Sequence, residues 1–225
     1  MDIKGYKVNF LGDSITEGVG VSNRADCRYD KRLEKMCQLS ATNNYGIGGT
    51  RLAHQMCPSG KPRHDLCFCG RVYDIDPSAD MVVVYGGVND YLHGDAPFGK
   101  IGDTTPATFC GGVHFLMWYL TENFRGKPIV FMAPARCYRP GEIDDLVPSD
   151  RPGKGPDAKP LRAYVDVILE TAKQFHIPVL DLYYQLGIDP HDTEQFTAYT
   201  ADGLHFNDAG HEILAQRLKQ FIDSL

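Results

Sequence analysis

The sequence Phe10-Leu-Gly-Asp-Ser-Ile-Thr-Glu-Gly18 places a serine directly after a short apolar run. The residues before Gly12 are β-branched or aromatic, which is typical of a buried strand. The residues after it are suited to begin a helix. A serine between a strand and a helix lies at the carboxyl edge of a parallel sheet, where ligands bind in open α/β folds. Ser14 is therefore the candidate nucleophile.

Apolar runs and helical periods alternate along the chain, which is the pattern of βαβ units around a parallel sheet. The run Met81-Val-Val-Val-Tyr85 is apolar throughout, as a central strand covered on both faces should be. Trp118 falls in the middle of a predicted helix and is expected in the core. The predicted strands are 7–11, 42–45, 81–85, 129–132 and 178–182, and the predicted longer helices are 26–37, 108–124, 159–175 and 207–225.

Size and composition indicate one globular domain over residues 1–225. Single cores stop growing only beyond about 250 to 300 residues, so this length suits one core. The net charge of −6 argues against a nucleic-acid surface, which needs clustered Lys and Arg. Because no run of about 18 apolar residues occurs, neither a transmembrane helix nor a membrane partner is expected.

The amino-terminal residues 1–7 lack the apolar region of a secretory signal peptide. We therefore expect a cytoplasmic protein, or a secreted one from which a leader was removed. Seven cysteines are an odd number in a chain large enough to fold without disulfides. This favours reduced thiols.

A serine hydroxyl needs a neighbouring base, and the chain carries two Asp-x-x-His pairs near its end. In Asp202-Gly-Leu-His205, the spacing on a turn lets the carboxylate orient the imidazole. In Asp208-Ala-Gly-His211, Asn207 or Asp208 is placed to cap the last helix, so that His211 falls inside its first turns. We therefore predict that Asp202 and His205 serve Ser14, and that His211 is structural.

Acyl transfer also requires hydrogen-bond donors for the oxyanion that develops in the reaction. Three strand ends offer such donors: the backbone N–H of Ser14, a glycine N–H in the stretch 46–49, and the side-chain amide of Asn89. Glycine suits this role because the absent Cβ lets the backbone approach a substrate. Asn89 could instead cap a turn, although Asp90 is the better candidate for that. Asp13 is expected to hydrogen-bond within its own tight turn.

Taken together, these blocks resemble the SGNH hydrolases, also called GDSL-type esterases and lipases. The chain carries Gly12-Asp-Ser14, Asn44-Tyr-Gly-Ile-Gly-Gly49, Gly87-Val-Asn-Asp90 and Asp202-Gly-Leu-His205 in this order. Each block follows a predicted strand or precedes the last helix, and the resemblance covers nearly the whole domain. It implies a flavodoxin-like α/β three-layer sandwich with a five-stranded parallel sheet, and neither metal nor cofactor.

The resemblance also implies a role for each site residue. Ser14 is then the nucleophile, His205 the base and Asp202 the residue that orients the base. The oxyanion hole is then formed by the amides of Ser14 and Gly49 and by the side chain of Asn89.

The second block departs from the family pattern in two ways. The family often has Asp-Thr or Asp-Ser after the glycine, whereas this chain has Thr50-Arg51. Because Gly48 and Gly49 are adjacent, either amide could be the donor.

Two stretches rich in Gly, Pro and Asp, 91–106 and 137–160, follow strands that point at the same sheet edge as Ser14. Long loops in compact domains are usually functional or disordered, so we expect these to form the walls of the substrate cleft. Tyr91, Arg136 and Tyr138 are candidates to grip a sugar or an acyl chain, the aromatic rings by stacking.

Cys57, His64, Cys67 and Cys69 are close enough in sequence to suggest a zinc site. The pair Cys67-Phe-Cys69 is, however, too tight for the ligand pairs of structural zinc sites. We expect an irregular loop without a metal.

The expected function is a serine esterase that removes short acyl groups, above all acetyl from carbohydrates, through an acyl-serine. The cleft loops are polar, and no broad apolar segment is present to shelter a fatty chain. A lysophospholipase-like lipid hydrolase or a thioesterase is the alternative. A flavodoxin-like module that binds a phosphate or glycan without chemistry is an alternative of another class. Such a module has no need of the Asp202–His205 pair, and the chain lacks the Gly-x-Gly-x-x-Gly motif of dinucleotide binders. The expected partner is a small-molecule or glycan ester.

Overall fold

The computed structural model describes residues 1–138 and 157–225. Five strands form one parallel sheet in the order β2-β1-β3-β4-β5, which confirms the predicted α/β fold. The strands are β1 (Lys7–Gly12), β2 (Ala41–Gly46), β3 (Met81–Tyr85), β4 (Ile129–Ala133) and β5 (Val179–Asp181). Because β1 has β2 on one side and β3 on the other, the strand order reverses beside β1. The residues that follow β1 therefore lie at the topological switch point, where open sheets bind ligands.

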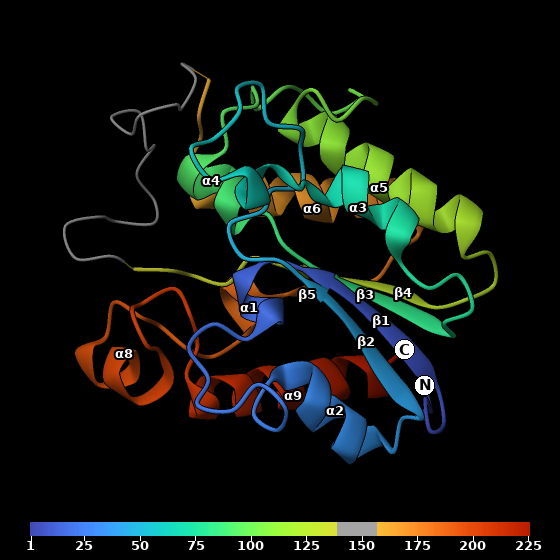
Figure 1. Ribbon diagram of the computed structural model, residues 1–225, viewed down its shortest axis with the longest axis vertical. Coiled ribbons are helices and arrows are strands. Elements are labelled where there is room, and N and C mark those ends of the chain that lie inside the picture. Colours follow the sequence, from blue (N-terminus) through green and yellow to red (C-terminus); the bar gives the residue numbers. More distant parts are fainter. Residues whose placement is uncertain (139–156) are drawn as a thin grey trace.

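Helices cover both faces of this sheet, which gives three layers (Figure 1). The helices α3, α5 and α6 lie on one side, and α2 and α9 on the other (Figure 1). The helix bounds are α1 Ser14–Glu17, α2 Tyr29–Cys37, η1 Pro62–Asp65, α3 Phe68–Arg71, η2 Val72–Asp74, α4 Val88–His93, α5 Phe109–Asn123, α6 Leu161–Phe175, α7 Leu182–Gln185, α8 Thr193–Tyr199 and α9 Asp208–Asp223.

The central strand β3 shows why both faces must be covered. Successive side chains of a strand point to opposite faces. Val82 and Val84 belong to the core under α5 and α6, whereas Val83 belongs to the core above α2 and α9. All five residues of β3 are buried. A strand that is apolar on both faces is stable only between two layers of helices.

Several expectations differ from the structure. The helix expected from residue 26 begins at Tyr29, because Arg28, at its N-cap position, is in an extended conformation. Trp118 is 46% exposed and is not a core residue, because the apolar stripe of α5 turns away from it. Residues 91–93 belong to α4 and not to a loop. Residues 139–156 of the second expected cleft wall lie outside the described residues. None of the helices in the described ranges is both long enough and apolar enough to span a membrane.

Candidate active site

The end of β1 positions Ser14 by a tight turn. Asp13 is the N-cap of α1, and its Oδ1 accepts a hydrogen bond from the Ile15 N–H at 3.0 Å. A Cβ at Gly12 would lie 1.9 Å from Thr16 Oγ1, so only glycine lets α1 fold back over the strand end. The turn thus places the Ser14 hydroxyl at the carboxyl edge of the sheet, as the sequence predicts.

Ser14, His205 and Asp202 come together in a chain of hydrogen bonds. Ser14 Oγ lies 2.9 Å from His205 Nε2, and His205 Nδ1 lies 2.7 Å from Asp202 Oδ2. An ionised carboxylate only accepts hydrogen bonds, so Nδ1 carries the proton of the neutral ring. Nε2 can then accept the proton of the serine hydroxyl, which is the arrangement that activates a serine.

The turn that carries Asp202 keeps its carboxylate ionised. Burial by itself raises the pKa of Asp202, but hydrogen bonds from the His205 ring and backbone outweigh it and hold the pKa well below its usual value. Oδ1 also accepts from the backbone N–H of Leu204 at 3.0 Å and of His205 at 2.7 Å. These contacts fix both the charge and the orientation of the carboxylate.

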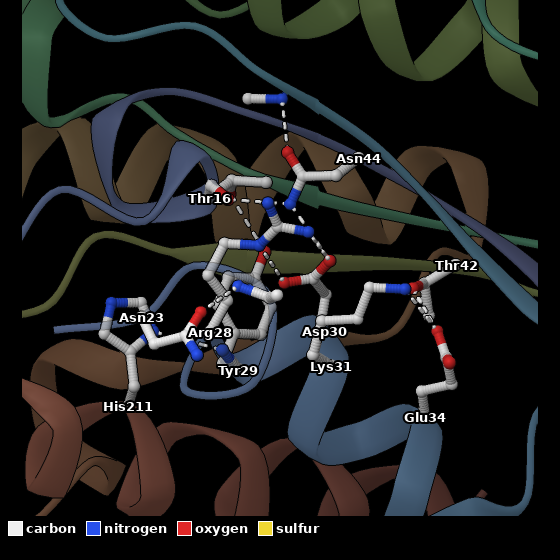
Figure 2. Close-up of polar contacts among 12 residues, drawn as sticks. Thr16, Asn23, Arg28, Tyr29, Asp30, Lys31, Glu34, Thr42, Asn44 and His211 are labelled. Carbon is white, nitrogen blue, oxygen red and sulfur yellow. Dashed lines mark hydrogen bonds and ion pairs between the residues drawn. The ribbon is translucent and has the colours of Figure 1, made fainter. Parts of the chain in front are cut away.

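The second Asp-x-x-His pair does not form a site. His211 is 0% exposed, its Nδ1 accepts the Tyr29 N–H at 3.1 Å, and its ring stacks on Tyr29 with centroids 6.0 Å apart (Figure 2). Burial, with Arg32 nearby, lowers the pKa of His211 to about 3. Asp208 accepts instead from the backbone and hydroxyl of Ser22. The structure thus places His211 in the core inside the first turns of α9, and its structural role stays a prediction.

Asn44, the first residue of the second sequence block, ties α1 to the end of β2 (Figure 2). Its Nδ2 donates to the Thr16 carbonyl at 2.7 Å and to Asp30 Oδ2 at 3.1 Å, and its Oδ1 accepts the Gly46 N–H at 2.9 Å. The buried Asp30 is in turn held by both nitrogens of the Arg28 fork at 2.9 Å. Because α1 is a single turn, it depends on such contacts from its neighbours.

The loop after β2 presents one glycine amide to the site. The Gly48 N–H donates to Glu17 Oε2 at 2.7 Å and is engaged. The N–H groups of Gly49 and Ser14 have no hydrogen-bond partner among residues 1–138 and 157–225. Gly49 has a φ of 77°, and a Cβ there would lie 2.5 Å from the His64 ring. The geometry therefore favours Gly49 over Gly48 as a donor.

Asn89 is the second residue of α4, which follows β3. Its Nδ2 donates to the Thr50 carbonyl at 3.0 Å and makes a longer contact of 3.4 Å with Asp13 Oδ2. Burial raises the pKa of the Asp13 carboxyl to about 6, and its hydrogen bond from Ile15 works against this rise. Asn89 is thus placed beside the turn that carries Ser14.

The sequence predicts that Asp90 caps a turn, whereas the structure shows it holding backbone that is distant in the sequence. Its two carboxylate oxygens accept the backbone N–H groups of Leu52, at 2.9 Å, and Ala53, at 3.1 Å. These bonds hold the segment after the second sequence block against α4.

Arg71 is a residue of this region that the sequence analysis missed. Its Nη1 donates to the Tyr45 carbonyl at 2.5 Å, and its Nη2 donates to the Gly12 carbonyl at 3.0 Å and to Thr50 Oγ1 at 2.9 Å. Burial lowers the pKa of this guanidinium to about 10. Arg71 thereby joins the ends of β1 and β2. The available signal was a cation within the otherwise apolar stretch 68–72.

The three candidate substrate contacts have different positions. Tyr91 is 2% exposed and packs edge-on against Tyr164 in the core, so the expectation that it grips a substrate is wrong. Arg136 donates to Asp189 at 2.9 Å. The Tyr138 N–H donates to the Gly203 carbonyl at 2.9 Å, which joins the segment after β4 to the turn of Asp202 and His205.

Arg136 lines a cavity of about 510 Å³. The cavity lies among residues that follow β4 and β5 and residues at the start of α6. Its other lining residues are Arg162, Tyr183, Tyr184, Gly187, Ile188, Asp189 and Gln195.

The suggested zinc residues do not gather. Cys67 and Cys69 are buried, whereas Cys57 is exposed. Across residues 1–138 and 157–225, no group of three or more His, Cys, Asp or Glu side chains could hold a metal ion. Within the same ranges no two cysteines form a disulfide.

Comparisons with known proteins agree with this geometry. Residues 10–213 match a family model described as the GDSL-like Lipase/Acylhydrolase family. A comparison with curated proteins gives no match. One solved structure is 28% identical and covers 100% of this chain and 99% of its own, with a TM-score of 0.86.

A protein from Lactobacillus plantarum is 27% identical, and the alignment covers 99% of this chain and 98% of that chain with a TM-score of 0.80. The acetyl xylan esterase AlAXEase is 21% identical, with 95% and 98% coverage and a TM-score of 0.61. At that identity the likeness shows the shared fold.

Proposed function

Since the chain belongs to the GDSL-like lipase/acylhydrolase family, we propose that it is a serine esterase whose substrates are O-acetyl groups on carbohydrates. Family membership by itself makes the chain a hydrolase that acts on esters. The proposal adds the residues that carry out the reaction and the class of ester.

The observation that carries the proposal is the 2.9 Å contact between Ser14 Oγ and His205 Nε2, with Asp202 behind the imidazole. His205 takes the hydroxyl proton while Ser14 Oγ attacks the ester carbonyl carbon. Asp202 holds the ring and stabilises the imidazolium that forms. The oxygen of the tetrahedral intermediate is stabilised by the amides of Ser14 and Gly49 and by Asn89 Nδ2.

The remaining steps follow from the same pair of residues. The imidazolium of His205 returns its proton to the leaving sugar oxygen, and the bond between that oxygen and the carbonyl carbon breaks. Ser14 then carries the acyl group. His205 next takes a proton from water, which attacks the acyl-serine and releases acetate, and the proton passes back to Ser14.

Three observations support a carbohydrate ester. The cavity beside Arg136 is lined by two arginines and two tyrosines, and such hydrogen-bonding and aromatic side chains suit the polar edges and apolar faces of sugar rings. The segment that carries Arg136 and Tyr138 is bonded to the turn of His205. AlAXEase, which has the same fold, is an acetyl xylan esterase.

The test is a chain-length series of p-nitrophenyl esters, from acetate to laurate, together with acetate release from acetylated xylan. The proposal predicts the highest kcat/KM for the acetate ester, measurable acetate release, and no turnover by Ser14→Ala. Faster turnover of long-chain esters would favour the lipid hydrolase, and a preference for acyl thioesters the thioesterase. A folded protein without any turnover would favour a binding module.

A further inference from the structure

His93 holds the oxygen of the Asn89 side chain. The two residues lie one turn apart on α4, and His93 Nε2 is 3.0 Å from Asn89 Oδ1. On the other side of the ring, Arg51 Nη1 lies 3.0 Å from His93 Nδ1. Arg51 Nη2 forms an ion pair with Asp65 at 3.1 Å. Asp65, Arg51, His93 and Asn89 thus form one continuous chain of polar contacts.

The donor in each contact follows from the chemistry of the groups. A guanidinium has hydrogens to donate and no lone pair to accept with, so His93 Nδ1 accepts from Arg51. In a neutral ring the proton then sits on Nε2, which donates to Asn89 Oδ1. This fixes which end of the Asn89 amide is oxygen, and turns its NH₂ group toward Thr50 and Asp13.

We infer that His93 is a positioning residue for the oxyanion hole, set in its tautomer by Arg51. This inference rests on the proposed function. Thr50 and Asp13 favour the same amide orientation, but they do so by drawing the N–H groups to themselves. His93 restrains the side chain through its oxygen and occupies neither N–H group. The N–H that points at Asp13 is held only by a 3.4 Å contact and is the one available to an oxyanion.

Arg51 is suited to this task by its surroundings. Its side chain is 2% exposed, and Asp65 balances its charge. Because the Arg51 guanidinium is buried and held by Asp65, it donates to His93 Nδ1 from one fixed position. This restricts the His93 ring to one tautomer and one orientation. Arg51 also stands where the second sequence block departs from the family pattern. The residue by which this chain differs from the family pattern is therefore the one that orients His93.

The test is a double-mutant cycle with p-nitrophenyl acetate, using kcat per active site titrated with a fluorophosphonate. The variants are His93→Phe, which keeps a ring without hydrogen bonds, His93→Gln, which offers an amide NH₂ donor group and a carbonyl acceptor, and Asn89→Ala. We expect His93→Phe to lower kcat roughly tenfold to a hundredfold with little change in KM, and His93→Gln to restore most of it. In the Asn89→Ala background, His93→Phe should have no further effect, because His93 acts through Asn89.

Two further measurements separate positioning from folding and from the proposed function. Thermal melting reports stability, and His54→Phe, on an exposed side chain, is the control that should leave kcat unchanged. The ¹⁵N shifts of His93 should show a protonated Nε2 and an unprotonated Nδ1. An equal loss of kcat in both backgrounds, no rescue by His93→Gln, or the opposite tautomer would each overturn the inference. If the wild type hydrolyses no ester, the proposed function fails. The ¹⁵N shifts still show whether His93 donates to Asn89, so the positioning of Asn89 by His93 is tested separately.

Discussion

Ser14 Oγ and His205 Nε2 lie 2.9 Å apart although the two residues are separated by 191 positions in the chain. The turn before α9 achieves this approach. Thr200 and Phe206 form an antiparallel bridge, and the Ala201 N–H donates to the His205 carbonyl at 2.8 Å. The imidazole is therefore held over the end of β1 by backbone contacts and not by the serine alone.

The two histidines near the end of the chain should behave differently. We predict that His205→Ala lowers kcat for p-nitrophenyl acetate by at least roughly a thousandfold, because no base remains for Ser14. His211→Asn keeps an acceptor for the Tyr29 N–H and should retain most of the activity while lowering the melting temperature. A collapse of kcat in His211→Asn with normal turnover in His205→Ala would show that the wrong histidine is assigned.

The same histidine should make stability depend on pH. His211 has a pKa of about 3 in the folded protein and about 6.5 when unfolded. Between these values the unfolded chain binds a proton that the folded protein does not, so stability is lost as pH falls from about 6.5. Unfolding in urea measures the free energy of unfolding of wild type and of His211→Asn. The difference between the two should shrink by about 2 kcal/mol from pH 7.5 to pH 5. A difference that stays constant with pH would contradict the burial of a neutral imidazole.

Gly49→Ala should damage both stability and activity. Its φ of 77° strains any residue with a Cβ by about 1 kcal/mol, and that Cβ would also meet the His64 ring. We expect a fall in kcat of roughly tenfold or more, since the Gly49 N–H moves. Gly5→Ala is the matched control, because Gly5 has a φ of 79° and nothing within 4 Å of a Cβ. Its strain should lower the free energy of unfolding by about the same amount and leave kcat unchanged. An equal kcat in both variants would show that Gly49 is not part of the site.

Arg71→Met should be strongly destabilising. The substitution removes the Nη1 donor of the Tyr45 carbonyl and the Nη2 donor of the Gly12 carbonyl, which then keeps the Ile47 N–H, and it buries no charge in their place. We expect the free energy of unfolding to fall by about 3 kcal/mol or more. Arg71→Lys keeps a charge but not the fork, and should fall between wild type and Arg71→Met. Unfolding in urea measures all three, and equal midpoints would show that Arg71 does not join the strands.

The sequence predicted the sheet because its strands are apolar runs of ordinary length, and the longer helices because their apolar residues repeat over several turns. A helix of one or two turns has no such repeat, which is why α3, α4 and α7 were not expected, whereas the start of α1 was predicted from the end of the strand before it. Tyr91 was assigned to a loop for the same reason, and α4 carries it into the core.

Ser14, Asp202, His205, Gly49 and Asn89 could be named in advance because each stands in a short block at a strand end or before the last helix. The contacts of Arg51, His93 and Arg71 are different. Arg51 with His93 and Arg71 with Gly12 form long-range hydrogen bonds to groups that only the folded chain brings near. His93 and Asn89 are only four residues apart, but their contact depends on α4, which the sequence did not predict. Pattern therefore locates the proposed site residues, and coordinates are needed to see what holds them.

The most direct test of Ser14 as the nucleophile is covalent labelling by a fluorophosphonate, followed by mass spectrometry of the intact protein and its peptides. We predict one adduct per chain, on Ser14, and at least roughly a hundredfold slower labelling in His205→Ala, because the hydroxyl then lacks its base. A folded protein that takes up no label, or takes it up at another residue, would contradict the assignment of Ser14 and His205.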